Sequence, residues 1–162
     1  MTMLIGRIEK HGRWWVALCE IVGAFTQGRS RREAMDNLAE VVELRVDRPR
    51  FKATVTELEP IGRGVLTVLI EPSEPAWLAA AVLRYQRARR GLSLADVARS
   101  LGAASRNAYA SYEQGQREPT LGKFRELLRA VAPEMALVLE PRASAATKRV
   151  PTRTRRAGKA AA

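Results

Sequence analysis

The chain has 162 residues, of which 28 are Lys or Arg and 17 are Asp or Glu, and its formal net charge is +11 at pH 7. This length allows one or two small domains. A single cysteine excludes an intramolecular disulfide and no apolar run is long enough to span a bilayer, so we expect a cytoplasmic protein with no membrane partner.

The charge is distributed unevenly along the chain. Residues 1–75 carry 11 basic and 11 acidic residues, residues 76–141 carry 10 and 6, and residues 142–162 carry 7 and none. A charge that served only solubility would be spread more evenly. The asymmetry therefore indicates a polyanionic partner for the second half and a different partner for the first.

The first half predicts a small α+β domain, which we place at residues 1–72. Five segments that alternate or are rich in β-branched residues predict strands: residues 4–9, 13–20, 24–28, 51–58 and 65–70. They form two antiparallel pairs and a short third strand beside the first pair. Ser30 followed by Glu33 is a capping-box pattern, and it predicts one helix from Arg31 to near Asp47.

The second half predicts an all-α domain at residues 73–141, followed by a disordered basic tail at residues 142–162, where few apolar side chains are available for burial. Four helices are expected, which begin at Pro75 and after Ser93, Ser105 and Thr120. The last is expected to turn five apolar side chains inward, namely Leu121, Phe124, Leu127, Leu128 and Val131. Residues 135–140 fit either a closing helical turn or a short strand.

The third of these helices has an unusual outward face. Helical spacing places Tyr109 and Tyr112 on the inner side, as core residues. The same spacing turns a guanidinium, a carboxamide and a hydroxyl outward beside the small Ala110. These are groups that hydrogen-bond to base edges in the major groove. The side chains expected to contact bases are Ser105, Arg106, Asn107 and Ser111.

The second and third helices, joined by a turn at Gly102, predict a helix-turn-helix that binds double-stranded DNA. Basic and amide side chains near it are expected to hold phosphates: Arg87, Arg90, Gln116 and Arg117. Because such proteins usually read two half-sites, we expect a symmetric homodimer or a higher homo-oligomer.

Two stretches resemble known families. The segments "SLADVARSLG" and "SRNAYASYEQGQREPTLGKFRELLRAV" resemble the Xre, or phage-repressor-like, helix-turn-helix family, with its Glu-x-Gly before a Pro at Glu113, Gly115 and Pro119. The stretch "GAFTQGRSRREA", residues 23–34, resembles the "G-x-x-T-Q-G-x-S-x-x-E-A" of the HicB antitoxin domain. That resemblance implies a partial ribonuclease-H-like fold, a HicA-like toxin partner that cleaves mRNA, and repression of the protein's own operon.

Adjacent strand residues point to opposite faces, so one of Trp14 and Trp15 is expected in the core. The other lies either under the edge of the helix or exposed, and an exposed tryptophan is a candidate for a protein interface. The residues assigned to partner binding are Trp14, Trp15, Phe25 and Gln27. The alternative to an antitoxin is a stand-alone Xre-type repressor whose N-terminal domain senses a ligand or a protein.

A third hypothesis, a nuclease in the first domain, requires several carboxylates that converge on metal ions. The strand acids are explained by a charge-balanced surface, and one histidine, His11, with one cysteine, Cys19, makes no metal site. We therefore expect no enzyme activity, no cofactor and no metal.

Overall fold

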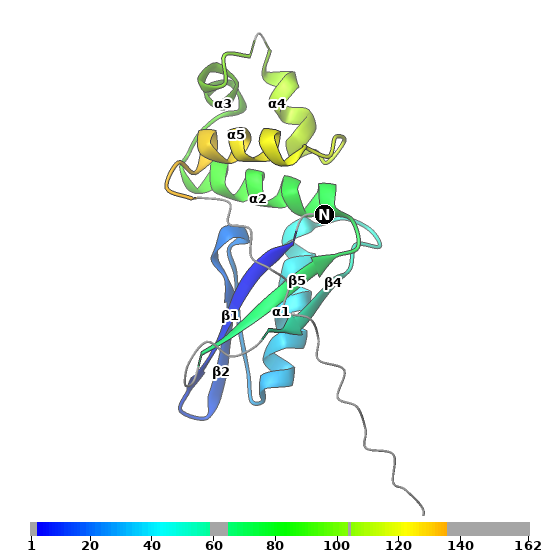
Figure 1. Cartoon of the computed structure of the whole chain (residues 1–162), viewed down its shortest axis with the longest axis vertical. Helices are drawn as coiled ribbons and strands as arrows, with labels where there is room; N and C mark the ends of the chain where they lie inside the picture. The colour runs from blue at the N-terminus through cyan, green and yellow to red at the C-terminus, as the bar shows by residue number, and fades with distance from the viewer. Residues whose placement is uncertain (1–2, 59–64, 104, 136–162) are drawn as a thin grey trace, which may run out of the picture.

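The computed structural model describes residues 3–58, 65–103 and 105–135. An antiparallel sheet and one helix form the N-terminal part, and four helices stack at one end of that sheet, with α2 nearest to it (Figure 1). The α+β class and the helical C-terminal part agree with the prediction. The predicted tail and most of residues 135–140 lie outside the described residues.

The sheet has five strands: β1 (Leu4–His11), β2 (Trp14–Cys19), β3 (Ala24–Gly28), β4 (Ala53–Glu57) and β5 (Val65–Pro72). Their order is β3-β2-β1-β5-β4, and every neighbouring pair is antiparallel. The register aligns Ile8 with Ala17 on β2 and with Leu66 on β5, so these buried side chains share one face. The opposite face, which we call the open face, carries the alternate residues of each strand.

Helix α1 (Arg31–Val46) begins as the sequence predicts. The Ser30 hydroxyl accepts a hydrogen bond from the Glu33 N–H at 3.1 Å, and the Glu33 carboxylate accepts one from the Arg29 N–H at 2.7 Å. Four side chains at helical spacing are buried on the inner face of the sheet: Ala34, Leu38, Val42 and Val46. The helix ends at Asp47, whose φ of 52° is left-handed.

A one-turn 3₁₀ helix, η1 (Glu20–Val22), separates β2 from β3 and was not predicted. Gly23 follows it with φ of 66°. A Cβ on Gly23 would lie 2.3 Å from the Tyr85 ring, so this turn needs glycine both for its backbone and for its contact with the helical part.

The helical part consists of α2 (Pro75–Arg89), α3 (Leu94–Ser100), α4 (Arg106–Glu113) and α5 (Leu121–Val131). In α5, Phe124, Leu127, Leu128 and Val131 are buried as predicted. The prediction for Leu121 was wrong, because its side chain is 59% exposed. Leu121 is the first residue of α5, directly after the Thr120 cap, where the helix has not yet reached the core.

One hydrophobic cluster runs through both parts of the chain, including Ile8, Val22, Leu78 and Leu127. Polar contacts join the parts as well. The fully buried Gln86 donates from Nε2 to the Ile21 carbonyl at 2.7 Å, and the Arg84 guanidinium donates to the Arg45 carbonyl at 2.9 Å. The helical part is therefore packed against the sheet part rather than tethered to it.

Candidate nucleic-acid interface

Helices α3 and α4 pack against each other, and Gly102, just after α3, has a left-handed φ of 64°. A complete capping box starts α3, because the Ser93 hydroxyl accepts from the Asp96 N–H and the Asp96 carboxylate accepts from the Ser93 N–H. Hydrogen bonds from Ser93 lower the pKa of Asp96 below its ordinary value, and Arg99 adds to this. The carboxylate thus stays charged at the N-terminal end of α3.

Helix α4 begins at Arg106, and Ser105 is its cap. The Ser105 hydroxyl accepts a hydrogen bond from the Asn107 N–H at 3.1 Å. The helix thus starts directly after Ser105. It also means that Ser105, assigned to base contact, already holds the first turn of α4 in place.

The exposed end of α4 carries Ser105, Arg106 and Asn107, as predicted. Within the described residues, the side chains of Arg106 and Asn107 make no hydrogen bond or ion pair. Ser111 is half-buried, and its hydroxyl donates to the Ala108 carbonyl at 3.0 Å. Of the four residues assigned to bases, Arg106 and Asn107 are therefore the two that are exposed and whose side chains make no bond to the described residues.

The orientation of α4 about its own axis differs from the prediction. Ala110 was expected outward but is 8% exposed, whereas Ala108 is exposed. Tyr109 is buried as expected, and burial, with the charge of Glu113 as a further cause, raises the pKa of its phenol. Glu113, a charged residue, is also buried on this side of the helix, at 6% exposure.

Glu113 faces Arg87 of α2 in a two-pronged ion pair. Arg87 Nε donates to Glu113 Oε1 at 2.6 Å and Arg87 Nη2 to Oε2 at 2.9 Å, while Nη1 donates to the Leu92 carbonyl at 2.8 Å. The two side chains are 20% and 6% exposed. The bond to Glu113 raises the pKa of Arg87 above its ordinary value. The pair fixes α4 against α2.

This geometry gives Arg87 a structural role that the sequence did not predict. Each of its three nitrogens donates to a protein acceptor, and its side chain is only 20% exposed. Phosphate contact by Arg87 stays a prediction. Arg90, also assigned to phosphate, is exposed but pairs with Glu134. Gln116 and Arg117 lie exposed in the turn after α4, where phosphate contact stays a prediction.

The role of Glu113 was missed because periodicity treats a carboxylate as a surface group. Its partner lies 26 residues earlier in the chain, outside any helical repeat. The Glu-x-Gly motif was the one available signal. The structure gives Gly115 of that motif a φ of 66° and no room for a side chain, since a Cβ would lie 2.7 Å from the Trp77 ring.

The residues assigned to partner binding fall on both faces of the sheet. Strand register places Trp14, Phe25 and Gln27 on the open face, with Phe25 67% exposed. Trp15 lies on the opposite face and packs against the core. One of the two tryptophans, Trp15, is therefore partly buried against the core, as expected. Partner contact by either tryptophan stays a prediction.

Cations surround both tryptophans. Arg13 and Arg29 lie over the Trp14 ring at 5.5 and 5.8 Å from its centroid.

Among the described residues, no three His, Cys, Asp or Glu side chains gather in a group able to hold a metal ion. Likewise, none of the described helices is long and apolar enough to cross a membrane.

Comparison with known families bears on the helical part. Residues 83–131, from the second half of α2 to the end of α5, match the helix-turn-helix family HTH_3. The match supports the prediction of an Xre-type helix-turn-helix in this segment. The match supports sequence-specific DNA binding and transcription regulation. Comparison with curated proteins and with solved structures gives no significant match.

Proposed function

We propose that the protein is a transcription repressor that reads its operator with the N-terminal end of α4. The observation that carries this is the position of Arg106 and Asn107 at the leading end of α4, exposed and not bonded to other described side chains. Arginine pairs with guanine and asparagine with adenine through two hydrogen bonds each. The family match at residues 83–131 supports the same use of this segment.

The test compares one base contact with one phosphate contact. Duplexes that bind the full chain are first selected from a random library to define an operator. Arg106→Ala is expected to weaken operator binding by about 1–3 kcal/mol and to relax selection at one base pair, whereas Arg117→Ala weakens all duplexes alike. Equal losses on operator and random DNA for both variants would contradict the assignment.

We also propose that the N-terminal part binds a HicA-like toxin, as in HicB antitoxins. The stretch at residues 23–34 that resembles HicB forms β3 and the capped start of α1. The neighbouring open face carries Trp14 and the exposed Phe25, and no described helix covers it. Large aromatic side chains on an uncovered face are typical anchors of protein interfaces.

The toxin proposal is tested with the tagged full chain recovered from its native host. A small ribonuclease recovered in near-equal amount, whose RNA cleavage the chain blocks, supports an antitoxin. Phe25→Glu should abolish this recovery, whereas Leu44→Glu, which changes an equally exposed apolar residue on α1, should not. If operator binding is found without such a ribonuclease, the stand-alone repressor remains.

We further propose that the repressor binds its operator as a symmetric homodimer, because helix-turn-helix proteins usually contact two half-sites about one helical turn apart. Light scattering of the protein–operator complex measures the stoichiometry. Two chains per operator are expected, and one chain per operator would contradict the proposal.

A further inference from the structure

The loop between α1 and β4 contacts the C-terminal end of α4. Arg48 Nη2 donates to the Gln114 carbonyl at 2.7 Å, and Gln114 is the C-cap of α4. In the same loop, the buried Phe51 packs against Trp77 with ring centroids 6.5 Å apart, and Trp77 in turn lies against Gly115. The loop is thus held to the C-terminal end of α4 by a polar and an apolar contact.

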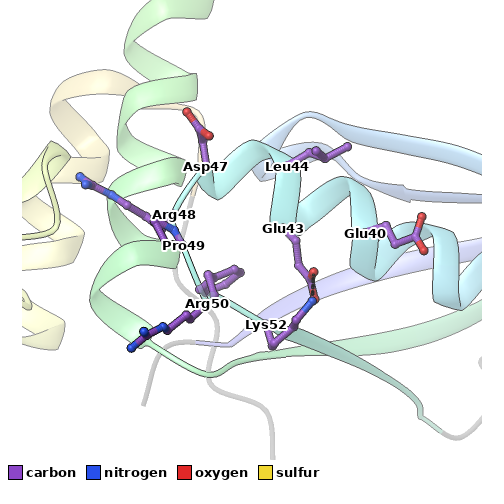
Figure 2. Close-up of a pocket in the computed structure, with 9 residues that line it drawn as sticks. Glu40, Glu43, Leu44, Asp47, Arg48, Pro49, Arg50 and Lys52 are labelled. Carbon is purple, nitrogen blue, oxygen red and sulfur yellow. Dashed lines mark hydrogen bonds and ion pairs between the residues drawn. The ribbon is translucent and has the colours of Figure 1, made fainter.

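The backbone of this loop is unusual. Asp47 and Arg50 both have left-handed φ angles, 52° and 66°, which cost a residue with a side chain about 1–2 kcal/mol. Arg48 and Arg50 both extend from the loop on the side away from α1 (Figure 2). Lys52, farther along, instead pairs with Glu43 of α1 at 2.8 Å.

The two arginines carry charge that the described part of the protein does not neutralise. Arg48 gives one N–H group to a neutral carbonyl, and no carboxylate pairs with it among the described residues. Within the same residues Arg50 has neither a hydrogen bond nor an ion pair. Both side chains are exposed. Four further N–H donors of Arg48 and all five of Arg50 remain for another acceptor.

The length of α4 indicates what lies beside them on DNA. Its eight residues span about 12 Å, close to the width of the major groove. When the N-terminal residues of α4 meet the base edges, its C-terminal end lies at the edge of the groove, where the phosphates run. The Arg48 guanidinium, bound at Gln114, is held at that edge together with Gln116 and Arg117.

We propose that Arg48 and Arg50 contact the DNA backbone, so that the N-terminal part of the chain holds the same duplex as the helix-turn-helix. This inference rests on the proposed DNA-binding function. It adds to that function a phosphate-binding element from outside the matched segment at residues 83–131. Such contacts set the orientation of the protein on the duplex without reading sequence.

The experiment measures salt dependence with the full chain. Affinity for a fluorescent 30-base-pair duplex of mixed sequence is followed between 50 and 300 mM salt for the wild type, Arg48→Gln and Arg50→Gln. Each lost phosphate contact should reduce the slope of log affinity against log salt by about 0.9. Arg48→Lys keeps the charge and should keep the slope.

Arg32→Gln is the matched control. It removes one exposed charge from the opposite end of α1, roughly 20 Å away, or about two Debye lengths at 0.1 M salt. Its slope should equal that of the wild type. Equal reductions in Arg32→Gln and Arg48→Gln would show a general effect of net charge and would overturn the inference.

The remaining outcomes separate the two proposals. If the wild type binds the duplex and neither Arg48→Gln nor Arg50→Gln changes the slope, the inference is wrong and the repressor stands. A wild type that binds neither this duplex nor any duplex selected from the random library refutes the proposed function itself. Thermal unfolding identifies any variant that has lost its fold. If Arg48→Gln is such a variant, the result for Arg50→Gln decides the test, because the Arg50 side chain makes no bond among the described residues.

Discussion

Removal of Arg87 should destabilise the protein far more than removal of a surface arginine. Arg87→Met leaves Glu113 at 6% exposure with a charge that nothing neutralises. Breaking a buried pair in this way costs about 3–5 kcal/mol. For a chain of this size that lowers the unfolding midpoint by roughly 6–20 °C, because each kcal/mol shifts it by about 2–4 °C.

The free energy of unfolding is measured by urea titration with tryptophan fluorescence. Arg99→Met is the control, since Arg99 pairs with Asp96 on the surface, with side chains 78% and 43% exposed, and its loss should cost below about 1 kcal/mol. The double variant Arg87→Met with Glu113→Leu removes both buried charges. It should recover most of the lost stability.

The single variant Arg87→Met decides whether Arg87 contacts phosphate or holds Glu113. If Arg87 contacts phosphate, Arg87→Met should reduce the salt slope of DNA binding by about 0.9 and leave stability close to that of Arg99→Met. That result would refute the structural role derived from the Glu113 pair. A large loss of stability that the double variant restores would confirm it.

Two further predictions concern the packing of the N-terminal part. Burial raises the pKa of the Cys19 thiol to about 11, and Cys19 is 1% exposed. At pH 8 a thiol reagent should therefore modify Cys19 at least about 100-fold more slowly in the folded protein than in urea. Comparable rates would place Cys19 outside the core. Gly23→Ala should lower the free energy of unfolding by about 2–4 kcal/mol, from left-handed strain and the clash with Tyr85. Gly12→Ala, at φ of 58° with open space around it, has the strain alone and should cost about half as much or less; equal losses would show that the Tyr85 contact does not matter.

Local patterns predicted most elements. The Ser30, Ser93, Ser105 and Thr120 caps each start a helix in the structure, because a cap depends on residues only two or three positions away. The strands and the opposite orientation of Trp14 and Trp15 follow equally from the alternation of side chains along a strand. The exposed polar start of α4 was also predicted, since its polar residues stand together in the sequence.

Strand order was not visible in the sequence. The two predicted strand pairs join into one sheet in which β5 lies beside β1, so the last strand borders the first and β4 becomes an edge. Nothing local distinguishes this order from others, because pairing between distant strands depends on which faces can be buried together. The short η1 turn was missed because its shape depends on the packing of Tyr85 and Gln86 against it.

The sequence by itself determined the α+β class, the helix boundaries and the helix-turn-helix, because each depends on neighbours within about one or two turns of chain. Only the tertiary structure decided which charged residues are used internally. Arg87 and Arg48 are both arginines, yet Arg87 donates from all three of its nitrogens to protein acceptors, whereas Arg48 makes one hydrogen bond and is exposed at the end of α4. The reason is that the role of a charged side chain depends on the partner that folding places beside it. The partners of Arg87 and Arg48 lie 26 and 66 residues away along the chain.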